Sequence, residues 1–131
     1  MTIALLASEQ ELRLESNIYH TITKELTHKE RPKIYMQIKI PSIEQFPSHF
    51  EIVTHCEKAD ILLITYAKEV NIKCQNKIIF GTRKKTLSTK NTVGAFFWQK
   101  GRPNILFYKS RIEKIGLDLG KDFQKYIDNE K

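Results

Sequence analysis

The sequence predicts one α/β domain: a three-layer sandwich built on a flavodoxin-like, mostly parallel sheet, with an antiparallel C-terminal hairpin at its edge and a terminal helix. Three observations predict this fold. Apolar runs alternate with helical or irregular segments along most of the chain, two aromatic runs then flank a glycine-proline turn, and the last residues are apolar at helical spacing. A chain of 131 residues with 40% hydrophobic residues fits a single domain over residues 1–131.

The first expected strand is residues 2–6, and a helix is expected to follow it from about Glu9 to Leu26. Ser8 and Glu11 have the spacing of a capping box at the start of that helix. Its apolar side chains recur at helical spacing and predict a stripe that packs on the sheet: Leu12, Ile18, Tyr19, Ile22 and Leu26.

Further strands are expected in four apolar runs, at residues 34–40, 50–54, 59–66 and 76–82. The first run alternates apolar with polar side chains and stops at Pro41, which indicates a wetter face or an edge position. The run 59–66 is the most continuous, so we expect it to form the buried central strand.

The last third of the chain predicts a hairpin followed by two helices. Residues 94–99 and 104–108 flank the turn sequence KGRP and read as antiparallel strands. Ser110 and Glu113 repeat the capping-box spacing before a short helix that ends at Gly116. A final helix is expected over residues 118–127, because its apolar side chains share one face.

The motifs of several enzyme and cofactor classes are missing. The first strand-to-helix turn, ASEQE, has no glycine that would let a phosphate approach the backbone, which argues against a dinucleotide or P-loop site. The spacings of His49, His55, Cys56 and Cys74 match no zinc motif, so we expect neither a metal site nor another cofactor. No catalytic constellation is visible, and the two cysteines fit either one disulfide or two buried thiols.

Positive charge is concentrated in one part of the chain. Residues 81–115 contain nine basic residues against the single acid Glu113, a net charge of +8, whereas the rest of the chain sums to −1. Such a field suits an anionic partner, although it also fits a solvated face that confers solubility. No apolar run approaches the length of a membrane span, and the opening residues MTIALLAS lack the basic flank of an export signal.

We therefore expect a non-enzymatic interaction module that holds a protein partner with an acidic patch on the hairpin and the basic tract. The expected contact residues are Arg83, Lys84, Lys85, Lys90, Trp98, Lys100 and Arg102. The alternative is a cytoplasmic nucleic-acid binder, in which the cations contact phosphates and Trp98 stacks on bases. An enzyme that holds an anion in the loop RKKTLSTK is a third hypothesis.

The closing block of the chain resembles the YfiR-like family of small periplasmic regulators. In that family a glycine-led strand, a Gly-Arg turn, a second strand and a Gly-Leu pair before a last helix occur in this order. The positions that carry the resemblance are Gly94, Phe97, Gly101, Arg102, Phe107, Gly116, Leu117 and Leu119. The resemblance implies a periplasmic protein that restrains a membrane-bound diguanylate cyclase by binding its sensor domain. It implies this location only if an export signal preceded Met1.

Overall fold

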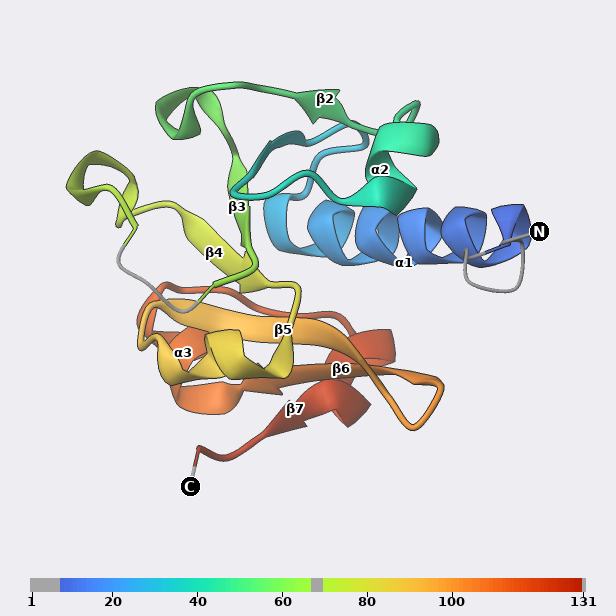
Figure 1. Cartoon of the computed structure of the whole chain (residues 1–131). Helices are drawn as coiled ribbons and strands as arrows, with labels where there is room; N and C mark the ends of the chain where they lie inside the picture. Colours follow the sequence, from blue (N-terminus) through green and yellow to red (C-terminus); the bar gives the residue numbers. More distant parts are fainter. Residues whose placement is uncertain (1–7, 67–69, 131) are drawn as a thin grey trace.

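The computed structural model describes residues 8–66 and 70–130 (Figure 1). Its α-helices are α1 (Glu9–Thr27), α2 (Pro41–Gln45) and α3 (Lys109–Lys114). Its strands are β1 (Lys33–Met36), β2 (Glu51–Ile52), β3 (Ile61–Ile64), β4 (Ile78–Gly81), β5 (Thr92–Gln99), β6 (Arg102–Tyr108) and β7 (Ile127–Asp128). Its 3-10 helices are η2 (Cys56–Lys58), η3 (Ile72–Cys74), η4 (Lys84–Ser88) and η5 (Lys121–Tyr126).

The strands form one seven-stranded sheet in the order β2-β1-β3-β4-β5-β6-β7. All neighbours from β2 to β5 are parallel, β5 and β6 are antiparallel, and β6 and β7 are parallel again. The predicted α/β class with a mostly parallel sheet is therefore confirmed. The strand expected at residues 2–6 lies outside the described residues.

The two faces of the sheet have different covers. The larger core packs α1, α2 and η5 on one face, where Ile34, Leu63, Phe80 and Phe96 are almost fully buried. Side chains alternate between faces along each strand, so Leu62, Ile64 and Ile79 point to the other face. That second face carries η2 and η3 in place of long helices, and the Cys56–Cys74 disulfide joins the two turns.

Helix α1 forms as the sequence predicts. The Ser8 hydroxyl accepts a hydrogen bond of 3.0 Å from the Glu11 backbone N–H, which caps the helix start. Tyr19, Ile22 and Leu26 are buried in the larger core. The apolar run 59–66 contains β3, an interior strand of the sheet whose four residues are all buried, although β4 is the middle strand of the seven.

Three predictions about the C-terminal third are wrong. The final helix is only the 3-10 helix η5, after which Ile127 and Asp128 pair with β6 as β7. Because β7 occupies that side, the β5–β6 hairpin is not the outermost element of the sheet. Ser110 does not cap α3, because the N-cap of this helix is Tyr108. The Ser110 hydroxyl donates instead to the Glu130 carboxylate, at 3.4 Å.

The second strand is also shorter than predicted. Strand β1 ends at Met36, because Ile40 is already the N-cap of α2 and Pro41 occupies its first turn, where proline costs no hydrogen bond. In the part of the chain that the structure describes, no helix is both long and apolar enough to cross a membrane.

Candidate functional site

The carboxyl ends of β1, β3, β4 and β5 lie at the same edge of the sheet, because these strands are parallel. We call this edge, formed by residues 37–39, 65–66, 82–85 and 98–102, the carboxyl edge. Sheets of this kind bind their ligands outside the carboxyl ends of the strands. A ligand or partner site is therefore expected at the carboxyl edge.

A cavity of about 460 Å³ lies at the carboxyl edge between β4, η4 and β5. Its lining residues are Thr82, Arg83, Lys84, Lys85, Phe97, Trp98 and Gln99. We call it the cationic cavity. Among the described residues, its lining includes three cationic and two aromatic residues and no acidic residue.

Gly81 allows η4 to pack against the sheet at this point. A Cβ atom on Gly81 would collide with the side chain of Thr86, which is fully buried. The Thr86 hydroxyl donates back to the Arg83 carbonyl and closes the turn. The three cations are thereby presented from a short, well-packed element.

Aromatic rings hold two of these cations in place. The guanidinium carbon of Arg83 lies 5.8 Å from the ring centroid of Tyr66, and Lys84 Nζ lies 6.0 Å from that of Phe97. Ion pairs among residues 8–66 and 70–130 involve none of Arg83, Lys84 and Lys85. Within the described part of the chain, no carboxylate therefore neutralises these three charges.

The hairpin tip extends the same edge. Lys100 and Gly101 form a two-residue turn with φ values of 53° and 74°, the positive values that a tight hairpin of this type requires. Trp98 lies just before the turn with 43% of its surface exposed. Its indole Nε1–H donates to the Glu15 carboxylate of α1 over 2.7 Å, which fixes the base of the tip.

The structure brings most of the predicted contact residues together, with one exception. Arg83, Lys84, Lys85 and Trp98 line the cationic cavity, and Lys100 and Arg102 are exposed on the same hairpin. Lys90 lies apart. It precedes β5, whose eight residues separate it from the tip by roughly 25 Å at about 3.3 Å per residue.

The basic tract of residues 81–115 is therefore divided between the two ends of β5. At the far end, the Arg111 guanidinium donates to the carbonyls of Thr89 and Thr92 and to the Glu130 carboxylate. This arginine has a structural role, because its side chain is only 10% exposed and its charge is paired.

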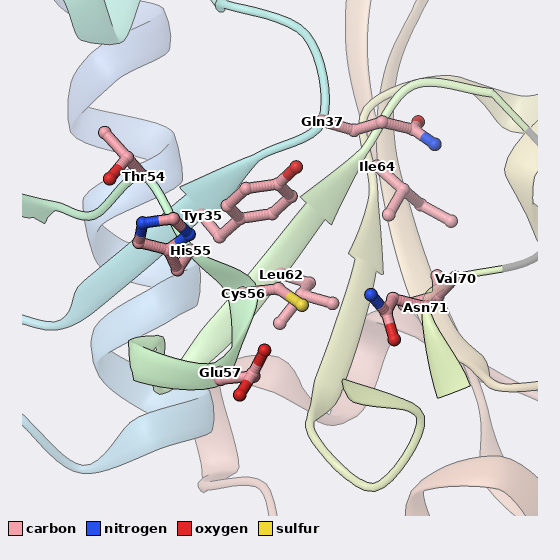
Figure 2. Close-up of a pocket in the computed structure, with 10 residues that line it drawn as sticks. All are labelled: Tyr35, Gln37, Thr54, His55, Cys56, Glu57, Leu62, Ile64, Val70 and Asn71. Carbon is pink, nitrogen blue, oxygen red and sulfur yellow. The ribbon is translucent and has the colours of Figure 1, made fainter. Parts of the chain in front are cut away.

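A second cavity, of about 370 Å³, lies on the disulfide face beside β1 and β3 (Figure 2). Its floor is apolar, with Leu62 and Ile64 from β3. Polar groups surround this floor: Tyr35, Gln37, Thr54, His55, Glu57 and Asn71. Gln37 bridges the strands at this point, since its Oε1 accepts from the backbone N–H groups of Thr65 and Tyr66, each at 2.8 Å.

This cavity was not predictable from the sequence. Its polar residues come from separate segments, and Gln37 lies inside the strand expected at residues 34–40, so no local pattern grouped them. Among the hydrogen bonds of the described residues, none joins His55 to Glu57 or to a hydroxyl group. Nor do residues 8–66 and 70–130 contain a cluster of three or more side chains suited to a metal.

No protein-family model matches the chain, and no curated protein sequence is significantly similar to it.

Proposed function

We propose that this chain is a non-enzymatic interaction module that binds an acidic surface of a partner protein at its carboxyl edge. The observation that carries the proposal is the cationic cavity, where Arg83, Lys84 and Lys85 lie beside aromatic residues and form no ion pair with an acidic residue of the described ranges 8–66 and 70–130. Such complementary charge steers association and selects the partner.

The aromatic residues favour a protein partner. Arginine, tryptophan and tyrosine are the residues that most often dominate the binding energy of protein interfaces. Tyr66 and Trp98 are 48% and 43% exposed at this edge; the Trp98 indole is held by its hydrogen bond to Glu15, and the Tyr66 ring lies 5.8 Å from the Arg83 guanidinium carbon. A fixed side chain loses little entropy on binding, so the Trp98 ring suits a hot spot.

The proposal includes a periplasmic location and membership of the YfiR-like family. The Cys56–Cys74 disulfide supports an oxidising compartment, where such bonds persist. The resemblance of residues 94–120 to YfiR-like proteins agrees with a periplasmic regulator whose partner is the sensor domain of a membrane-bound enzyme. The proposal also includes a flavodoxin-like three-layer sandwich. The strand order β2-β1-β3-β4-β5 supports it.

Charge reversal at the two ends of β5 tests the proposal. The variant R83E/K84E/K85E changes the cationic cavity, and K90E/K109E/K114E changes the net charge equally at exposed positions of the far end. Immobilised wild-type chain and both variants are incubated with membrane extract of the source organism, crosslinked and compared by mass spectrometry. We expect a partner that binds the wild type and the far-end variant but not R83E/K84E/K85E.

Two outcomes would contradict the proposal. One is a partner that both variants retain equally. The other is tight binding of single-stranded RNA or DNA oligonucleotides that weakens steeply with salt and changes Trp98 fluorescence, which would favour the nucleic-acid alternative.

A further inference from the structure

We infer that the outer edge of β6, with the apolar groove beside it, binds an extended segment of the partner by strand addition. This inference rests on the proposed function, since it requires a protein partner, and it adds how that partner is held. The occupant is a segment that alternates apolar residues with others and has acidic residues near the hairpin tip.

The edge of β6 is only partly covered. Strand β7 pairs with Phe107 and Tyr108 alone, and among the described residues no strand pairs with Arg102 to Leu106 on that side. Figure 1 shows the hairpin extending well beyond β7 toward its tip. Main-chain groups along this stretch are therefore candidates for pairing with another chain.

The hairpin register decides which of these groups point outward. Gln99 and Arg102 flank the two-residue turn, so their backbone groups hydrogen-bond to each other. Along the hairpin away from the turn, every second cross-strand pair is bonded in the same way. The backbone groups of Pro103, Ile105 and Phe107 then face away from β5. Phe107 agrees with this alternation, since β7 pairs there. Pro103 offers only its carbonyl, which leaves three outward groups: that carbonyl, and the N–H and C=O of Ile105.

A groove of about 410 Å³ lies beside the same residue. It runs between α1, β6 and η5, and most of its surface is apolar, from Leu14, Ile18, Ile105, Phe123 and Tyr126. Leu14 is 49% exposed although it lies on the helix that covers the sheet. Ile105 thus presents its side chain to the groove and its backbone to the open edge, which is the arrangement that strand addition uses.

Charge defines the polarity of the segment. Lys100 and Arg102 are exposed at the tip, whereas the described lining of the groove itself has one cation, Lys125, and one acid, Asp122. An acidic residue is therefore favoured beside the tip, and the side chains that enter the groove are apolar. A second copy of this chain is a poorer occupant, because it would bring Pro103 and the same positive charges to the contact.

The test uses ¹⁵N-labelled chain and a synthetic peptide of alternating valine and glutamate at millimolar concentration. We expect the Ile105 amide to exchange more slowly with solvent when the peptide is present, and the resonances of Leu14 and Ile18 to shift. The variant L14E is expected to weaken peptide binding by about tenfold, because it places an unpaired carboxylate in the apolar groove. Leu14→Met is the matched control and is expected to bind like the wild type.

The outcome separates this inference from the proposed function. Arg83, Lys84 and Lys85 are on the η4 side of the sheet. In R83E/K84E/K85E, the peptide should therefore still slow the exchange of the Ile105 amide, even though this variant no longer binds the partner protein. Three results would each overturn the inference. The first is a set of peptide-induced shifts confined to residues 83–85, and the second is the absence of any shift. The third is protection of the Ile105 amide by self-association of the chain without peptide. Sedimentation at the same concentration detects self-association.

Discussion

Trp98 and Glu15, 83 positions apart, are joined by a hydrogen bond of 2.7 Å from the indole Nε1–H to the carboxylate. The bond ties the β5–β6 hairpin to the first half of α1. Phe96 and Tyr19 extend this contact into the core, with an edge-to-face ring pair 5.1 Å apart. Burial, and secondarily the Glu15 charge, raise the pKa of Tyr19, so this phenol remains protonated. The base of the hairpin tip is thus held rigidly at the carboxyl edge.

Replacing Glu15 with alanine should loosen this attachment. A hydrogen bond to a charged group at a partly exposed site contributes about 1 kcal/mol, so we expect a loss of that size in the free energy of unfolding. Trp98 is the only tryptophan, so its fluorescence reports the change directly: the emission of E15A should shift to the red. Urea unfolding followed by this emission measures both effects. E15Q, which keeps an acceptor, should lose less.

Glu9→Ala is the control for that experiment. It removes an equal charge from α1, and the ion pair of Glu9 with Arg13 is exposed on both sides. An equal red shift in E9A and E15A would show that the hydrogen bond to Trp98 is not the cause.

Reduction of the Cys56–Cys74 bond should destabilise the protein. The bond joins residues 18 positions apart, and closing a loop of this size stabilises a fold by about 3 kcal/mol. The apolar cluster that it covers is small, which leaves η2 and η3 few other contacts to hold them. We expect dithiothreitol to lower the urea midpoint of the wild type. The variant C56A/C74A should unfold at that lower midpoint with or without the reductant, and equal wild-type midpoints would contradict the prediction.

Acid should weaken the attachment of β7. Arg111 donates to both carboxylate oxygens of Glu130, at 3.0 and 2.8 Å, and this pairing lowers the pKa of Glu130 below its usual 4.5. Because the folded-state pKa is the lower one, the stabilisation is present above 4.5 and is lost as the pH falls through the folded-state pKa. E130Q should therefore unfold with a flatter pH dependence on the acid side than the wild type.

Thermal unfolding between neutral and acidic pH tests this dependence. E113Q is the control, because Glu113 is exposed on the neighbouring helix α3 and has no ion pair within the described residues. If E113Q and E130Q flatten the acid side equally, the pairing with Arg111 is not responsible.

Local signals made α1, β3 and the hairpin predictable. The cap at Ser8, the continuous apolar run of β3 and the glycine turn of the hairpin each act within a few neighbouring residues, so the chain itself encodes them. The turn is shorter than the predicted KGRP, because β6 already begins at Arg102. Gly94 was only partly predictable from local signals. Its position at the start of a strand was visible, but the reason for a glycine was not: a Cβ there would collide with the Leu106 carbonyl across the hairpin.

The residue types of the candidate site were predictable from the sequence, but their positions in the fold were not. The sequence indicated that cations and Trp98 belong to one tract, and parallel strand order explains why residues 83–85 and 98–102 meet at one edge. It could not show that Lys90 lies at the other end of β5, or that Arg111 is occupied by Glu130. Distance along the chain does not report distance in space once a strand separates two residues.

By itself, then, the sequence determined the α/β class, the long first helix, the buried strand β3 and the excess of positive charge, because hydrophobic period, capping and turn chemistry are local properties. Only the tertiary structure decided that Cys56 bonds Cys74, that Ile127 and Asp128 form a strand, and that Trp98 is fixed by Glu15. Each of these depends on a partner that folding brings near, and a two-residue strand or a single hydrogen bond has too little local preference of its own to be predicted without that partner.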